Sequence, residues 1–396
     1  MLGFGHVRHV RDGWLSRTRP AAPAAADFGR TSVRLLQLAP GATEYMCTAA
    51  TEVPGTVAGG TGPQLDAATM AARIRDAFQG QGFRGGRIAV TLQAELFQAD
   101  MARLPAMPDH ELAESVRFEA TDRFGIDREG HAIGHLKLGT TTGGGSEVLM
   151  LAVPRSAVAA ACAALGSRDT HAFRIEHAAL SALRAVGRQR SSECDDPADA
   201  RDWAMLHLED RVATLVLLRD GAVAFMRTIR GDWAPAGTTK LHRTQAGKPI
   251  HLGGDEPIPV DGAPSEGSAS WRWCTLAEEV LRCLRHFERS TSGWWPREVS
   301  ITGPAAMDPQ AAATVESVCG VRSSLAVPIR MIDEPEACIH GNAWIAAIGA
   351  ACSELPALAR NPRALDVPRK APGGRTRASG ETDGGTRLPA TQGGRA

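Results

Sequence analysis

DFGRTS at residues 27–32 leads into the run TSVRLLQL at residues 31–38. The run is rich in apolar and β-branched residues, which predicts a strand. Gly29 lets the backbone approach a ligand closely, Asp27 can order Mg²⁺ through water, and the hydroxyls of Thr31 and Ser32 can donate hydrogen bonds. The stretch therefore indicates a hairpin suited to holding a phosphate. Asp and Gly are also common in ordinary turns, so a turn with no ligand is the alternative.

Strand-like and helical runs alternate on both sides of this hairpin, which favours an α/β fold. The expected strands, besides the first, are 87–92, 147–153, 203–209, 213–218, 222–228 and 298–302. The expected helices are Pro108–Phe124, one capped by Ser156 and stopped by Gly166, one over 275–289, and a last one capped by Asn342. Asp27–Leu38 and His207–Leu218 occupy matching places in two α/β halves, which indicates an internal duplication.

Composition limits the classes of protein that remain. With 396 residues the chain suggests two or three domains, and 43% hydrophobic with 22% charged residues is ordinary for a globular chain. The formal charge of zero argues against a general polyanion binder, so no specific nucleic-acid partner is expected. Eight cysteines without a C-x-x-C pair argue against a zinc finger. We find no signal peptide and no apolar run near the roughly 20 residues that a membrane span needs, which predicts a cytoplasmic protein.

Three segments lack the patterns of packed elements. Residues 1–23 form an N-terminal extension, and residues 231–270 are rich in Gly, Pro, Thr and Ser, which predicts a flexible insertion. Residues 356–396 carry eight basic residues against three acids, a net charge of +5, and are expected to be disordered. Such a tail is either a solvated appendage or a contact for an anionic membrane surface.

Motifs of common enzyme classes are absent from the sequence. There is no G-x-x-x-x-G-K-[ST] loop, no H-E-x-x-H helix and no G-x-S-x-G turn. The D-F-G at Asp27 is not accompanied by the H-R-D loop of a kinase. The sequence therefore predicts no catalytic and no metal-ligating residues.

Several segments, in order, resemble the PilM family of actin-like proteins of type IV pilus assembly, which is itself similar to FtsA. Asp27–Arg34 resembles the family's phosphate hairpin D-I-G-x-x-S-V-K, and Leu104–Ala120 resembles its L-P-x-M…E-L…E-A helix. Further similar segments are Glu147–Val153, Ala204–Gly231, Thr275–Ser290 and Ser300–Gly303. The resemblance covers roughly residues 24–350.

The resemblance implies an actin-like (ribonuclease H-like) two-domain fold. The first domain would be 24–195, with a small inserted subdomain at about 95–145, and the second would be 200–355. Nucleotide contacts would fall on Asp27, Gly29, Thr31, Ser32 and Gly303.

Departures from the family pattern fall on the nucleotide elements. The second hairpin carries His207-Leu208-Glu209 where the family has D-I-G, and the adenosine loop carries Gly303-Pro304 where the family has Gly-Gly. Glu209 brings a side chain and a negative charge toward the place of a phosphate, His207 replaces a carboxylate, and Pro304 lacks an N–H. We therefore predict weak or absent binding of ATP and Mg²⁺.

The function implied by the resemblance is a non-catalytic scaffold at the inner membrane that grips the cytoplasmic N-terminal peptide of a PilN-like membrane protein. The family's binding groove lies between the first half and the inserted subdomain. The expected partner-binding residues are Leu104, Met107, Glu111, Phe118, Glu119 and Phe124. MshI of the MSHA pilus and GspL of type II secretion are similar relatives. The alternative function is an actin-like ATPase that binds and slowly hydrolyses ATP.

Overall fold

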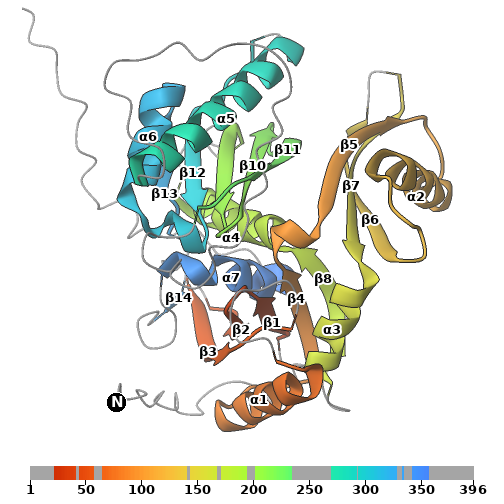
Figure 1. Ribbon diagram of the computed structural model, residues 1–396, viewed down its shortest axis with the longest axis vertical. Helices are drawn as coiled ribbons and strands as arrows, with labels where there is room; N and C mark the ends of the chain where they lie inside the picture. Colours follow the sequence, from red (N-terminus) through yellow and green to blue (C-terminus); the bar gives the residue numbers. More distant parts are fainter. Residues whose placement is uncertain are drawn as a thin grey trace, which may run out of the picture. The chain divides into compact units, whose positions relative to one another are not determined.

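The computed structural model describes residues 22–41, 44–57, 65–140, 143–166, 171–193, 201–233, 269–291, 293–327, 332–333 and 341–355. Three sheets and seven α-helices are found in these residues (Figure 1). Residues 1–21 of the N-terminal extension, residues 234–268 of the expected insertion and the basic tail lie outside the described residues.

The first sheet has the strand order β14-β3-β2-β1-β4-β8. Its strands are β1 (Ala24–Phe28), β2 (Ser32–Ala39), β3 (Tyr45–Pro54), β4 (Arg87–Leu92), β8 (His171–His177) and β14 (Ile332–Asp333). β1 and β2 form the antiparallel hairpin expected around Gly29, while β1, β4 and β8 run parallel. All of β1 and β2 is buried, as for strands covered on both faces.

The second sheet has the order β11-β10-β9-β12-β13. Its strands are β9 (Trp203–Leu208), β10 (Val212–Arg219), β11 (Ala222–Arg230), β12 (Glu298–Thr302) and β13 (Arg322–Leu325). A hairpin of β9 and β10 is followed by β11, and β9, β12 and β13 run parallel. This repeats the arrangement β3-β2-β1-β4-β8 of the first sheet, and the internal duplication is confirmed.

A third sheet lies between β4 and β8 in the sequence. It has the order β5-β7-β6, formed by β5 (Gln98–Leu104), β6 (His131–Thr140) and β7 (Ser146–Pro154). Helix α2 (Asp109–Phe124) packs on it through Leu112, Val116 and Ala120. The spacing of four residues between these apolar positions explains why the helix is amphipathic and could be predicted.

Helices form layers on the two larger sheets (Figure 1). α4 (Ala178–Glu193) and α7 (Ile345–Ala351) share one apolar core with residues of both sheets, including Leu36 and Trp203. α1 (Ala67–Gly80) and α3 (Arg155–Leu165) contribute to the core on the other face of the first sheet. α5 (Ala269–Ser290) and α6 (Pro309–Cys319) cover the outer face of the second sheet. The α4–α7 layer therefore connects the two sheets.

Two expected helix caps are wrong. α3 begins at Arg155 with Pro154 at its N-cap, so Ser156 lies inside the first turn. α7 begins at Ile345, and Asn342 is buried in the preceding 3-10 turn, Gly341–Trp344. Pro154 sets the backbone conformation at the start of α3, and the 3-10 turn does so at the start of α7. Neither N-cap residue makes a side-chain hydrogen bond to its helix. The strands 87–92 and 298–302 are confirmed at both ends.

Candidate functional site

The candidate site is a cleft at the carboxyl ends of the parallel strands of both large sheets. Phe28, Leu92 and His177 end β1, β4 and β8 in register. His207 and Thr302 are paired near the ends of β9 and β12. Ligands of open α/β sheets bind at such carboxyl ends, and the two expected phosphate hairpins meet here.

Asp27 is buried and already engaged by the protein. Its Oδ1 accepts a hydrogen bond from Thr91 at 2.6 Å, and its Oδ2 accepts one from Arg34 at 3.3 Å. Burial raises the pKa of Asp27, opposed chiefly by Arg34. The carboxylate expected to order Mg²⁺ therefore has protein partners on both oxygens.

The other residues expected to contact nucleotide are only partly brought together. Gly29 and Thr31 line the cleft. The hydroxyl of Ser32 instead donates to the Glu52 carboxylate on β3. Gly303 follows β12 with φ of 103°, and a Cβ there would lie 2.3 Å from the carbonyl oxygen of Leu208. Close contact with β9 therefore accounts for the glycine at 303 without any ligand.

Glu209 lies in the second hairpin at the position that matches Gly29 in the first. The N–H of Gly29 donates to the carbonyl of Ser32, and the N–H of Glu209 donates to that of Val212 in the same way. The Oε2 of Glu209 accepts a hydrogen bond from the backbone N–H of Ala94 at 2.8 Å. Burial raises the pKa of Glu209 to about 8, and the nearby charge of Asp27 adds to the rise. The carboxyl is therefore mainly neutral at pH 7, and the negative charge expected at this position from the sequence is wrong.

Arg30 lies between two acids from opposite sides of the cleft. Its Nη1 is 2.9 Å from Oε1 of Glu95, and its Nε is 3.6 Å from Oδ2 of Asp210. The Arg30 side chain is only 8% exposed. The position after Gly29 therefore carries a buried guanidinium that joins the first hairpin to the second.

Two buried histidines lie at the strand ends near the cleft: His207 lines the cavity, and His177 ends β8. His177 accepts a hydrogen bond at Nδ1 from the N–H of Ala179, and its ring centroid is 4.8 Å from that of Phe97. Burial lowers the pKa of His177 to about 3 and that of His207 to about 4. Both imidazoles are neutral at pH 7.

His207→Leu is expected to reduce the loss of stability that the protein suffers as pH falls. The folded pKa of about 4 lies below the ordinary value of 6.5, so the unfolded chain binds the extra proton and stability falls as pH drops from 6.5 to 4. Leucine removes this contribution, whereas His177 retains its own. Urea unfolding midpoints of the wild type and of His207→Leu, measured across this pH range, test the prediction. Equal slopes of midpoint against pH in the two proteins would contradict it.

The space left in the cleft is small. The cavity measures about 90 Å³ and is lined by residues of both hairpins together with Gln93, Pro304 and Ala343. Pockets for small organic ligands usually measure about 300–1,000 Å³. With Glu209 against Ala94 and Arg30 between two acids, the residues as arranged do not fit a Mg²⁺–nucleotide. Among the described residues no group of three or more His, Cys, Asp or Glu is placed to hold a metal ion.

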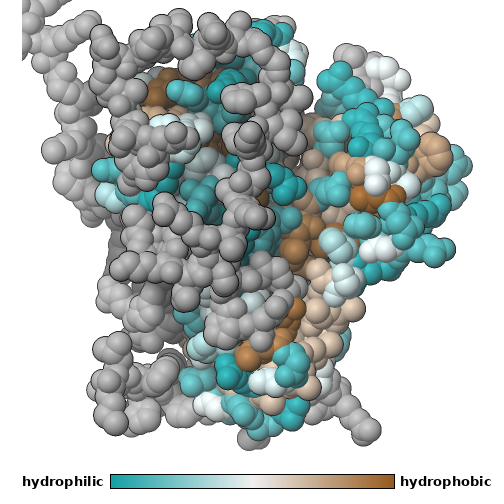
Figure 2. Space-filling view, in the orientation of Figure 1, coloured by the Kyte–Doolittle hydropathy of each residue, from teal (hydrophilic) through white to brown (hydrophobic). Residues whose placement is uncertain are grey.

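The six residues expected to bind a partner do not form one surface. Leu104, Met107 and Phe124 pack against the core of the inserted subdomain. Phe118 is 74% exposed on α2, and Glu111 is exposed. Glu119 pairs with Arg123 over 2.5 Å. The surface of this subdomain is mainly hydrophilic in Figure 2.

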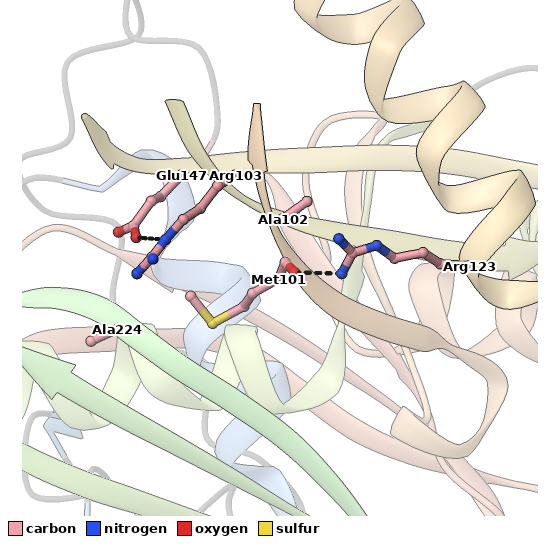
Figure 3. A pocket seen from close by; sticks show the side chains of 6 residues that line it. All are labelled: Met101, Ala102, Arg103, Arg123, Glu147 and Ala224. Carbon is pink, nitrogen blue, oxygen red and sulfur yellow. Dashed lines mark hydrogen bonds and ion pairs between the residues drawn. The ribbon is translucent and has the colours of Figure 1, made fainter. Parts of the chain in front are cut away.

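A second, larger cavity lies beside Glu119 and Arg123. It measures about 350 Å³ and is lined by Met101, Ala102, Arg103, Arg123, Glu147 and Ala224 (Figure 3). Arg123 donates to the carbonyl of Met101, and Arg103 pairs with Glu147. The cavity therefore lies between the inserted subdomain and β11 of the second sheet, whereas the family resemblance implies a groove between that subdomain and the first half.

No sequence motif indicates Gln93, Glu95 and His177 as residues of the candidate site. Each lies at or just past the end of a strand that runs parallel to β1. Since strand 87–92 was predicted, a parallel pairing with the first strand would have placed residues 93–95 at the cleft. No local sequence pattern predicts that Arg30 and Asp210 pair, because the pairing depends on how the two hairpins meet in the fold.

The fold class of the chain follows from its similarity to solved structures. The chain has an actin-like fold, with two similar sheets separated by helices and a small inserted subdomain. A chain from the PilM–PilN type IV pilus biogenesis complex matches with a TM-score of 0.64 and 16% identity, over 84% of this chain and 98% of that chain.

Other solved structures match less well. A Bacteroides thetaiotaomicron protein with an actin-like ATPase fold has a TM-score of 0.43 and 8% identity, over 86% and 100% of the two chains. The cytoplasmic domain of EpsL, an inner-membrane component of the Vibrio cholerae type II secretion system, has a TM-score of 0.40 and 9% identity, over 84% and 94%. No protein-family model matches the chain, and no curated protein matches it in sequence. None of the described helices is long and apolar enough to cross a membrane.

Proposed function

We propose that this protein is a PilM-like scaffold of a type IV pilus or a related MSHA or type II secretion system, and that it does not turn over ATP. The observation that carries the proposal is the fold match to a chain of the PilM–PilN complex, which extends over 84% of this chain and 98% of that chain. Its place is the cytoplasmic side of the inner membrane, and its partner is a PilN-like membrane protein. MshI-like and GspL-like roles belong to the same proposal.

The cleft supports a non-catalytic role. Glu209 replaces the glycine of the second phosphate hairpin, and its carboxyl is held against Ala94. Pro304 lines the cleft but has no N–H to donate. The alternative, a slow ATPase, rests on Asp27 and Gly29, and the Asp27 carboxylate is already bound by Thr91 and Arg34.

The cavity beside β5 is the place we propose for the partner's N-terminal peptide. β5 is an edge strand of the third sheet, and edge strands can accept an added extended chain. The volume of about 350 Å³ falls in the range of ligand pockets. Leu104, Met107 and Phe124 are half-buried against the subdomain core, whereas Arg123 and the edge of β5 line the cavity and Glu119 pairs with Arg123, so we propose that the peptide contacts Glu119, Arg123 and β5.

The direct test is affinity capture of the tagged protein from its own gently solubilised membranes, with bound proteins identified by mass spectrometry. Recovery of a single-span protein with a short cytoplasmic N-terminus supports the scaffold function. Recovery of soluble proteins alone contradicts it. A synthetic peptide copied from the captured protein's N-terminus then gives a dissociation constant by fluorescence anisotropy.

Glu119→Lys is expected to weaken binding of this peptide by roughly tenfold, about 1.4 kcal/mol. The substitution removes the carboxylate that Arg123 contacts at 2.5 Å and reverses the charge beside the cavity, while Asp100 and the Met101 carbonyl still hold Arg123. Glu278→Lys is the matched control, because Glu278 forms an exposed i,i+4 pair with Arg282 on α5. Equal affinities of the two variants would rule out this placement of the peptide.

A further inference from the structure

Two contacts join the walls of the cleft between the large sheets. Glu209, after β9, accepts the Ala94 N–H that follows β4, at 2.8 Å. Arg30, after β1, approaches Asp210 of the second hairpin at 3.6 Å while Glu95 holds its Nη1. Each contact joins a residue of the first half to a residue of the second.

Both contacts come from the positions where the hairpins would approach a phosphate. Glu209 corresponds to Gly29 by its place in the turn, and Arg30 directly follows Gly29. The side chains of Arg30 and Glu209 are 8% and 11% exposed. Loss of the hydrogen bond to Glu209 leaves the buried Ala94 N–H without its acceptor. Loss of the ion pair between Arg30 and Asp210 leaves a buried guanidinium with one partner fewer, and both losses are costly.

Charge in the cleft opposes an added polyanion. Asp27, Glu95 and Asp210 surround Glu209, and their negative charges are among the causes that raise its pKa. The guanidinium groups of Arg30 and Arg34 are already paired with Glu95 and Asp27. A triphosphate would have to compete with these internal acids for the same two arginines.

We propose that Glu209 and Arg30 form an internal latch that bridges the two halves where an actin-like ATPase holds its nucleotide, so that the cleft stays closed without nucleotide. This inference concerns the cleft alone and does not depend on the identity of the pilus or secretion partner. The protein would then present one fixed arrangement of its halves to any partner.

Hydrogen exchange of the full chain, read by mass spectrometry, tests the latch. Glu209→Ala and Arg30→Ala are each expected to speed exchange at least roughly tenfold in residues 93–97 and 207–212, on both walls together. Glu209→Gln keeps an acceptor for the Ala94 N–H and is expected to retain protection. Arg322→Ala is the matched control, because it breaks the exposed Arg322–Glu298 pair within the second half.

A second test of the latch measures hydrogen exchange of the wild-type protein with and without nucleotide, and needs no substitution. The wild-type protein is expected to exchange at the same rate with and without millimolar Mg–ATP. Slower exchange of these segments with Mg–ATP would overturn the latch, as would unchanged protection in both alanine variants. An equal increase throughout α5 would also overturn it, because the contacts would then stabilise the fold as a whole rather than close the cleft.

Discussion

Replacing Gly349 by alanine is expected to destabilise the protein by about 3 kcal/mol, the upper end of the usual cost of overpacking. Gly349 lies in α7 where this helix crosses α4, and a Cβ there would lie 1.8 Å from the carbonyl oxygen of Ser181. The obstructing atom is backbone, so it cannot move aside without displacing α4. The crossing is also fixed by hydrogen bonds from Ser181 to the Ala346 carbonyl and from Arg184 to the Gly349 carbonyl.

The matched control is Gly187→Ala in α4. A Cβ at Gly187 meets nothing within 4 Å. Alanine in a helix interior is favoured over glycine by roughly 0.5–1 kcal/mol, so this variant is expected to be slightly stabilised. Urea unfolding of both variants measures the difference. If the two midpoints shift in the same direction by similar amounts, the close crossing of α4 and α7 is contradicted.

The second large effect is a loss of stability between pH 4.5 and 8 that depends on Glu209. Its folded pKa of about 8 lies above the ordinary 4.5, so the folded chain keeps a proton that the unfolded chain has released. The contribution of the neutral carboxyl is full below pH 4.5 and is lost as pH rises through 8. Burial is the main cause, and Asp27, Glu95 and Asp210 add repulsion once Glu209 ionises.

Glu209→Gln is expected to flatten this dependence, because the amide keeps the shape of the side chain and does not ionise. The clearest window lies between pH 6.5 and 8, above the ordinary pKa of His207 and up to the folded pKa of Glu209. Urea midpoints of the wild type are expected to fall across this window while those of the variant change less. Parallel curves for the two proteins would show that Glu209 is not the group responsible.

The residues expected to bind a partner show that predicting a helix does not predict which nearby side chains form a binding surface. Residues 108–124 were correctly predicted as helical, since apolar residues recur every four positions. Leu104, Met107 and Phe124 are apolar residues near that helix, and such residues serve equally well in a core or in an interface. The three-stranded sheet beneath α2 covers one part of each of these side chains and leaves the other part exposed, so their part in partner binding stays a prediction.

The sequence alone predicts β2, β4, β7, β9, β10, β11 and β12 and the two matching hairpins, because hydrophobic periodicity and turn residues act over a few positions. It also indicates the altered second hairpin, since Glu209 departs from the phosphate pattern at a single position. It does not predict β3, β5, β6, β8 and β13, whose residues lack a clear strand pattern. Only the tertiary structure placed Ala94 against Glu209 and Arg30 between Glu95 and Asp210. These partners are far apart in the chain, and they meet because the parallel strands of two sheets end at one cleft, where burial sets the charge of each group.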